Sequence, residues 1–192
     1  MLDQSAKMLL GDITSINLDR KKKSVKNQFD FNARSLLNVI VGVDLCKIDG
    51  ISEVGAVELI SEIGLDIGKW KSHKHFSAWL NVAPNTKITG GKIINSKMQK
   101  KKNHAGQTLR MAASTLYHNK APIGEYARKM KSKLGKKGGI VATAHKLARI
   151  IYVMMKEKKE YNNEILIAEK ENWKQKRILY LEQQLKQLKD VA

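Results

Sequence analysis

Apolar positions recur at helical spacing along most of the chain. Runs of this kind predict helices over 34–43, 52–64, 72–82, 104–118, 122–134, 140–156 and 168–189. In the run 104–118, for example, Leu109, Ala112 and Leu116 fall on one face. Alternating apolar positions of the kind that marks strands are scarce. The pattern therefore predicts an all-α fold, a compact bundle of about six helices with a protruding C-terminal helix.

The same pattern divides the chain into three parts. Residues 1–32 are a polar N-terminal arm, 33–160 a helical domain and 161–192 a C-terminal helical arm. In the last helix Ile178, Leu181, Leu185 and Leu188 follow 3-4-3 spacing, and the flanks of this narrow stripe are Gln and Lys. Such a stripe is typical of a coiled coil. We therefore expect this helix to pack on another copy of the chain or on a partner protein.

A tight turn precedes the helix predicted from residue 52. In the segment LCKIDGISEVGAVELISEIG, Gly50 and Ile51 form the turn and Ser52 suits the N-cap. The apolar positions expected on the buried face of the helix are Val54, Val57, Ile60 and Ile63. This arrangement is typical of a helix-hairpin-helix, whose backbone N–H groups can meet a phosphate. The alternative is a plain packing hairpin, which the acidic Asp49 favours because it would repel phosphate.

Residues 85–102 break the helical pattern. Their sequence, NTKITGGKIINSKMQKKK, has six lysines and no acid, and Thr89-Gly90-Gly91 must turn. We expect a basic loop here, or a short β-hairpin at 85–95.

Charge then narrows the class of partner. The 192 residues carry 36 Lys and Arg against 18 Asp and Glu, a formal net charge of +18. Residues 67–156 alone hold 20 basic side chains and a single acid, Glu125. A block with charge of almost one sign favours binding to a polyanion. Nucleic acid is the preferred candidate, and an anionic membrane surface is the alternative. The longest apolar run, 150–155, is far too short to span a membrane.

The reactive residues exclude several kinds of site. A single cysteine, Cys46, allows neither an internal disulfide nor a cysteine-based zinc site, and fits a reducing, cytoplasmic compartment. His73 and His75 are two positions apart with no carboxylate beside them, which does not suit a metal site. We therefore expect no metal and no cofactor to be held by this chain.

Four stretches in this order resemble one family: LCKIDGISEVGAVELISEIG, HFSAWLNVAPN, ITGGKIINSKMQKKKNHAGQTLRMAA and IVATAHKLARIIYVM. They are similar to the C-terminal transposase domain of the bridge-RNA-guided insertion-sequence transposases, relatives of the Piv and MooV DNA invertases. The resemblance runs from about residue 30 to the C-terminus.

The resemblance implies a two-part catalyst. An N-terminal RuvC-like domain with an Asp-Glu-Asp-Asp set would hold Mg²⁺. The helical domain would offer a serine hydroxyl, in a Ser-Gly loop after a W-L-x-x-A-P element, to attack a DNA phosphate. Implied partners are DNA and a structured guide RNA, in a homo-oligomer. No RuvC-like domain fits before residue 30, so we expect the C-terminal half alone, truncated or separately encoded, and not active by itself.

Residues of the family motif map onto this sequence one by one. The W-L-x-x-A-P element stands as Trp79, Leu80, Ala83 and Pro84, and the nucleophile position holds Thr89 instead of serine. Ser96 matches a secondary serine position. The residues expected to contact DNA, which include the phosphate clamps Arg110, Lys146 and Arg149, are Gly50, Ile51, Ser52, Gly90, Gly91, Lys92, Lys97, Lys100, Lys101, Lys102, Asn103, Arg110, Lys146 and Arg149.

Two functions stay open at this point. The first is a recombinase domain that binds DNA and performs phosphoryl transfer with a hydroxyl nucleophile. The second is a non-catalytic basic helical module that binds DNA or RNA. The surroundings of Thr89 separate them, because a threonine hydroxyl needs a base or a metal nearby to attack, whereas a turn residue bonds its own backbone.

Overall fold

The computed structural model describes residues 29, 31–84, 86–95, 98 and 101–191. The chain divides into two compact units, Met1–Tyr161 and Asn162–Ala192. Most of the expected N-terminal arm, and Ser96, Lys97 and Lys100 of the expected basic loop, lie outside the described residues.

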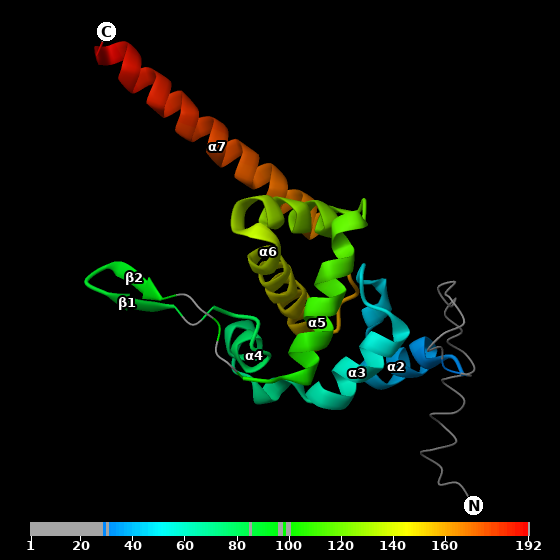
Figure 1. Cartoon of the computed structure of the whole chain (residues 1–192). Coiled ribbons are helices and arrows are strands. Elements are labelled where there is room, and N and C mark those ends of the chain that lie inside the picture. The colour runs from blue at the N-terminus through cyan, green and yellow to red at the C-terminus, as the bar shows by residue number, and fades with distance from the viewer. Residues whose placement is uncertain (1–28, 30, 85, 96–97, 99–100, 192) are drawn as a thin grey trace, which may run out of the picture. The chain divides into compact units, whose positions relative to one another are not determined.

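The first unit is helical apart from one small hairpin, so the predicted all-α class is confirmed (Figure 1). Its short 3₁₀ turns are Leu45–Lys47, Ile67–Lys69 and Leu116–His118. Its helices and strands are α2 (Ala33–Val41), α3 (Glu53–Ile63), α4 (His73–Trp79), β1 (Lys87–Thr89), β2 (Lys92–Asn95), α5 (His104–Thr115) and α6 (Pro122–Glu157). The second unit is the helix α7 (Glu164–Val191).

The core forms where α4, α5 and α6 pack together, with α3 against α5. Phe76 of α4, Leu109 of α5 and Ile151 of α6 are fully buried there. Along 140–156 the buried positions recur at helical spacing, at Ala144, Leu147, Ala148, Ile151, Met154 and Met155. Lys146 is buried as well, with 8% of its surface exposed, although it was expected to contact a phosphate.

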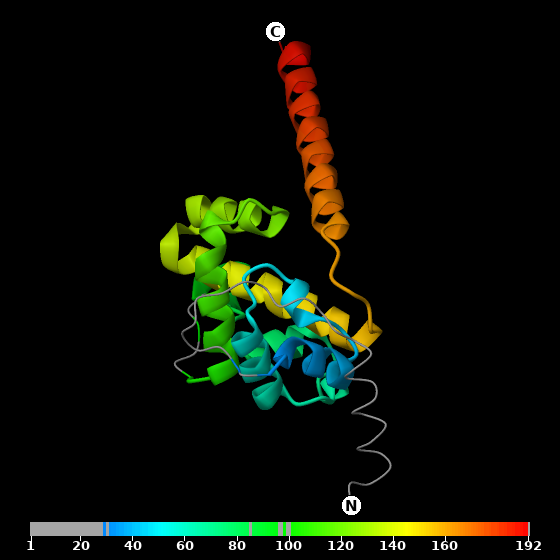
Figure 2. The same cartoon turned by 90° about the vertical axis from the view of Figure 1, so that its right-hand side faces the viewer.

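Gly135 interrupts α6, where the sequence predicted that one helix stops. Its φ of +74° and ψ of 173° are not helical, and glycine adopts this region without the strain that a side chain brings. The lime-coloured first part and the yellow second part of α6 run in different directions in both views (Figures 1 and 2).

The buried face of α3 differs from the expected one. Of the four positions expected to be buried, Ile63 is buried, whereas Val54, Val57 and Ile60 are only half-buried. Ala56 and Leu59 are buried beside Ile63 instead. The physical reason is that α3 contacts both α2 and α5. Because the helix is apolar around most of its circumference, its sequence cannot indicate which side meets these neighbours. The N-cap prediction is confirmed, since the Ser52 Oγ accepts a hydrogen bond from the Gly55 N–H at 3.1 Å.

A junction between the end of α4 and the start of α5 holds the base of the hairpin segment. Asn81, in the left-handed region with φ of 54°, donates from Nδ2 to the carbonyl of Lys101 at 2.7 Å. Asn103 caps α5 by accepting from the Gly106 N–H at 2.7 Å, and its Nδ2 donates to the carbonyl of Trp79 at 3.1 Å. The chain that leaves α4 and the chain that enters α5 are therefore fastened side by side.

Gly106 makes this junction possible. A Cβ at this position would stand 1.9 Å from the carbonyl oxygen of Leu80, which no side chain can tolerate. Only glycine lets α5 approach the end of α4 so closely.

The second unit, α7, carries exposed apolar side chains at Ile178, Leu181 and Leu185. These are three of the four positions of the expected coiled-coil stripe. The coiled-coil partner stays a prediction.

We expect opposite effects of Gly106→Ala and Gly55→Ala on stability, although both glycines hold the third position of their helices after an N-cap. Gly106→Ala should destabilise the fold by about 3 kcal/mol, because the methyl group overlaps the Leu80 carbonyl. A Cβ at Gly55 would meet the Ser52 Oγ at 3.4 Å, so the better helix propensity of alanine should add up to about 1 kcal/mol. Thermal melts followed by circular dichroism measure both, and equal shifts would contradict the junction.

Candidate nucleic-acid interface

The hairpin at 87–95 confirms the expectation of a short β-hairpin in this segment. Ile88 pairs with Ile93 and Thr89 with Lys92, which leaves Gly90 and Gly91 as a two-residue turn. Their φ values are +56° and +74°, and positive φ at both central residues is what a type I′ turn requires. The Gly-Gly pair therefore sets the register of the hairpin, which extends away from the helices of its unit (Figure 1).

Thr89, at the expected nucleophile position, is the last residue of β1 and is exposed. Its hydroxyl makes no hydrogen bond with another described residue. The structure thus shows neither of the two arrangements that would decide its role: no described base activates the hydroxyl, and the hydroxyl does not bond its own turn. No atom lies within 4 Å of the Cβ positions that Gly90 and Gly91 lack, so the tip is slender and open.

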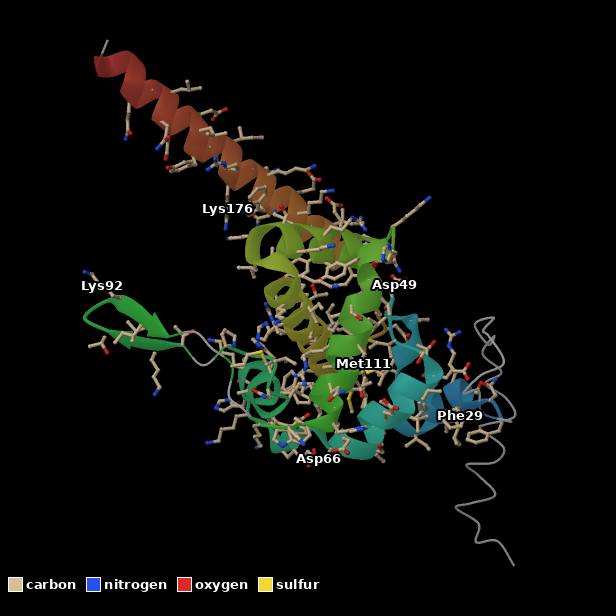
Figure 3. The ribbon with its side chains drawn as sticks, viewed as in Figure 1. Phe29, Asp49, Asp66, Lys92, Met111 and Lys176 are labelled. Carbon is tan, nitrogen blue, oxygen red and sulfur yellow. The ribbon has the colours of Figure 1, made fainter. Side chains whose placement is uncertain are left out.

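Exposed cations surround this hairpin in the sequence and continue across the helices. Figure 3 places Lys92 on the hairpin. Among the described residues, the exposed basic side chains that form no ion pair with a described carboxylate include Lys71, Lys74, Lys87, Lys92, Lys101, Lys102, Lys120 and Arg149. Elsewhere in the described chain, Arg34, Lys47, Lys159 and Lys174 form ion pairs with acids that lie outside 67–156.

Two of the residues expected to contact DNA belong to the α4–α5 junction instead of an open surface. The amide of Asn103 is occupied on both sides, by Gly106 and by the Trp79 carbonyl. Arg110 donates from Nη1 to the carbonyl of Asn81 at 3.3 Å, and burial lowers the pKa of its guanidinium. Arg149 is exposed and Lys146 is buried, so of these helical positions Arg149 is the most accessible to a phosphate.

The Gly50 turn packs against α5. Gly50 has φ of +87°, and a Cβ there would stand 3.1 Å from the carbonyl of Ala112 and from Leu116. Ile51 is buried, and only a 3₁₀ turn, Leu45–Lys47, precedes it where a helix-hairpin-helix has its first helix. The geometry of a tight turn before a capped helix is as expected, but the glycine serves close packing.

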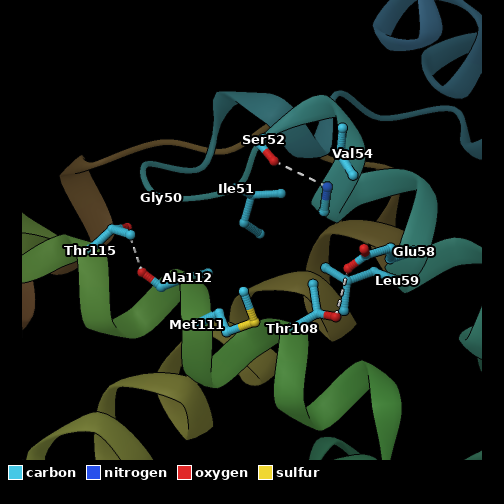
Figure 4. Close-up of a pocket in the computed structure, with 11 residues that line it drawn as sticks. Gly50, Ile51, Ser52, Val54, Glu58, Leu59, Thr108, Met111, Ala112 and Thr115 are labelled. Carbon is cyan, nitrogen blue, oxygen red and sulfur yellow. Dashed lines mark hydrogen bonds between the residues drawn. The ribbon is translucent and has the colours of Figure 1, made fainter. Parts of the chain in front are cut away.

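A cavity of about 400 Å³ opens between this turn and α5 (Figure 4). The acid that lines it, Glu58, accepts a hydrogen bond from the Thr108 hydroxyl at 2.9 Å. The Ser52 hydroxyl, which also lines it, accepts from the Gly55 N–H as the N-cap of α3. Asp49 lies in the turn and accepts from the Asn119 amide at 3.2 Å. The negative charge of these two acids opposes a phosphate at this end of α3.

Two histidines lie in a positively charged environment between α4 and α6. Burial lowers the pKa of His145, and the charges of Arg149, His73 and Lys146 lower it further. Burial likewise lowers the pKa of His73, with Arg149 and Lys74 adding to the effect. Sequence reasoning considered His73 only as a metal ligand beside His75 and overlooked its proximity to His145. The two lie 72 positions apart, and only packing brings them together.

Metal ligands do not gather in the described part of the chain. No group of three or more His, Cys, Asp or Glu residues that could hold a metal ion occurs among the described residues. The hairpin around Thr89 supplies lysines, whereas Mg²⁺ prefers carboxylate and carbonyl oxygens. The described residues near Thr89 therefore do not fit Mg²⁺.

A comparison with protein families identifies the domain. Residues 44–128, from the turn before α3 to the first part of α6, match the family described as Transposase IS116/IS110/IS902 family. These residues, which include the hairpin with Thr89, are therefore similar to the transposase domain of this family. No curated protein matches the chain. In the described residues, no helix combines the length and apolar character needed to cross a membrane.

We expect acid to destabilise the fold through His73 and His145. Their pKa values are lowered in the folded state, so the unfolded chain binds more protons near its ordinary histidine pKa of about 6.5. The stability they contribute is complete above that pKa and is lost as the pH falls through the folded values. Between about pH 7.5 and 5.5 the melting temperature should therefore fall by a few degrees.

The matched variants are His73→Gln with His145→Gln, and the exposed His118→Gln as a control. The double variant should flatten the dependence of melting temperature on pH, and the control should keep it. A double variant with the slope of the original protein would contradict the assignment.

Proposed function

We propose that this transposase domain binds DNA through the exposed cations of residues 67–156. The observation that carries the proposal is that several of these cations form no ion pair with a described carboxylate. Lys71, Lys87, Lys92 and Arg149, for example, are exposed and form no ion pair with a described acid. Unneutralised cations in one compact unit create a positive field, which the phosphate backbone of DNA neutralises with release of counterions. DNA as partner is in keeping with the cytoplasmic location expected from the sequence.

The proposal centres on the hairpin and the second part of α6. Lys92 and the Gly90-Gly91 turn are open to a phosphate, as are Lys101, Lys102 and Arg149. It does not extend to the Gly50 turn, because Asp49 and Glu58 would repel a phosphate there. Asn103 and Arg110 contribute by holding the start of α5 against the end of α4.

We further propose that Thr89 is positioned to attack a DNA phosphate, but only with help from outside this chain. In such a step the threonine oxygen bonds to phosphorus, a DNA oxygen leaves and takes a proton, and the threonine proton passes to a base. A secondary hydroxyl needs that base or a metal. The described residues near Thr89 provide neither, so the Mg²⁺ and base would come from the RuvC-like part that the family resemblance implies, together with a guide RNA.

The second candidate is a module that binds nucleic acid and performs no chemistry. The observation in its favour is that the Thr89 hydroxyl makes no hydrogen bond with another described residue. Both candidates share the DNA-binding surface and differ only in whether a covalent protein–DNA bond forms.

Salt dependence tests the shared surface. Binding to duplex DNA, measured by fluorescence anisotropy between about 50 and 200 mM salt, should weaken by about three powers of ten or more if six or more phosphates are contacted. The variant Lys101→Gln/Lys102→Gln should reduce the slope of log affinity against log salt by about 2. The control Lys176→Gln/Lys186→Gln removes two exposed charges of α7 and should leave the slope unchanged. Affinity independent of salt would overturn the proposal.

A trapping experiment separates the two candidates. The chain is incubated with a branched DNA and Mg²⁺, alone and with a RuvC-like half supplied separately, and covalent adducts are separated on a denaturing gel. We expect no adduct from the chain alone. An adduct in the mixture that persists in Thr89→Ser and disappears in Thr89→Ala would assign the nucleophile. Tight binding without adduct in every mixture would favour the module that performs no chemistry.

A further inference from the structure

The hairpin exposes apolar side chains in the middle of the basic block. Ile88 of β1 has 62% of its surface exposed and Ile94 of β2 has 68%, among the highest exposures of any large apolar residue in the described chain. Two such groups on one small hairpin form an apolar patch, and exposed apolar patches mark candidate contact sites. A two-stranded hairpin is also only marginally stable by itself in water, so it gains from a partner that covers it.

The charges on the hairpin indicate what kind of partner covers it. Lys87 and Lys92 are exposed beside the two isoleucines, and residues 67–124 contain no Asp or Glu. A protein surface or a second copy of this basic segment would have to neutralise these lysines. The major groove of DNA offers both components, since phosphates line its edges and the methyl groups of thymine lie on its floor.

The shape of the hairpin also fits a groove. Two strands joined by a Gly-Gly turn form a narrow ribbon, and the tip has no side chain to widen it. The major groove of B-form DNA, about 12 Å wide, admits a two-stranded ribbon of this kind. Asn81 and Asn103 join the end of α4 to the start of α5, so the chain leaves and re-enters the helices at one place.

We propose that the hairpin enters the DNA major groove as a two-stranded ribbon, with Ile88 and Ile94 against the methyl groups of thymine and Lys87 and Lys92 at the flanking phosphates. The inference rests on the proposed DNA binding and deepens it. The contact is apolar and local, so the hairpin favours T-rich sites without a hydrogen-bond code. Thr89 at the end of β1 is carried to the DNA by the same insertion.

The test removes the methyl groups from the DNA and the apolar groups from the protein in turn. Affinity is measured for a duplex of alternating A·T pairs and for the same duplex with uracil in place of thymine, which has the same charge. The protein variant is Ile88→Thr/Ile94→Thr, because threonine keeps β-strand propensity and the positions are exposed, so the fold should survive. Its melting temperature checks this.

We expect the original protein to bind the A·T duplex about tenfold more tightly than the A·U duplex, since each lost methyl contact weakens binding severalfold. The variant should bind both duplexes equally and keep the salt slope of the original protein, because no charge has changed. The control Leu134→Thr, which removes an exposed apolar side chain from α6, should keep the preference for thymine.

Other outcomes would overturn the inference, and they differ from the outcome that would overturn the proposed function. If the original protein binds with a steep salt dependence but equally to both duplexes, DNA binding stands and the groove contact is wrong. If the isoleucine variant changes the oligomeric state in light scattering and not the thymine preference, the hairpin meets another protein chain. If no salt-dependent binding occurs at all, the proposed function itself fails.

Discussion

The contact between the end of α4 and the start of α5 is the constraint on which the site depends. Gly106 lets the backbone of α5 lie against the Leu80 carbonyl, and Asn81 and Asn103 tie the two chain segments together. The hairpin between them has almost no packing of its own, because its described side chains are exposed. The junction instead fixes the two places where the chain leaves α4 and enters α5.

Charge imposes a second constraint on the same unit. The ion pairs outside the basic block stabilise the fold: the guanidinium of Arg34 donates to the buried Asp44 at 2.5 and 2.9 Å, and hydrogen bonding to Asp44 raises the pKa of Arg34. Glu160 accepts from the Asp44 N–H, which ties the end of the unit to its beginning. Among the described residues of 67–156 the only acid is Glu125, and burial with nearby positive charge lowers the pKa of His73 and His145. The fold thus tolerates self-repulsion that a polyanion would relieve.

Residues typical of turns and helix caps predicted where several elements begin and end. Ser52 before α3, Gly135 within α6 and the Gly-Gly turn of the hairpin each have a local physical requirement that the residue type reveals, so their positions followed from the sequence. The faces of the helices were less predictable. The buried side of α3 and the burial of Lys146 were missed, because a helix that contacts several neighbours has more than one apolar side and its sequence does not rank them.

The sequence by itself determined the helical class, the helix ends, the hairpin and the concentration of positive charge, because each depends on residues close together in the chain. The order of four motifs also indicated the transposase family that residues 44–128 match. Only the tertiary structure decided which candidate residues are accessible. It engaged Asn103 and Arg110 in the junction, used Gly50 for packing and brought His73 to His145, since these depend on contacts between segments distant in the chain. The tertiary structure likewise decided that Ile88 and Ile94 are exposed, because no described element packs against them.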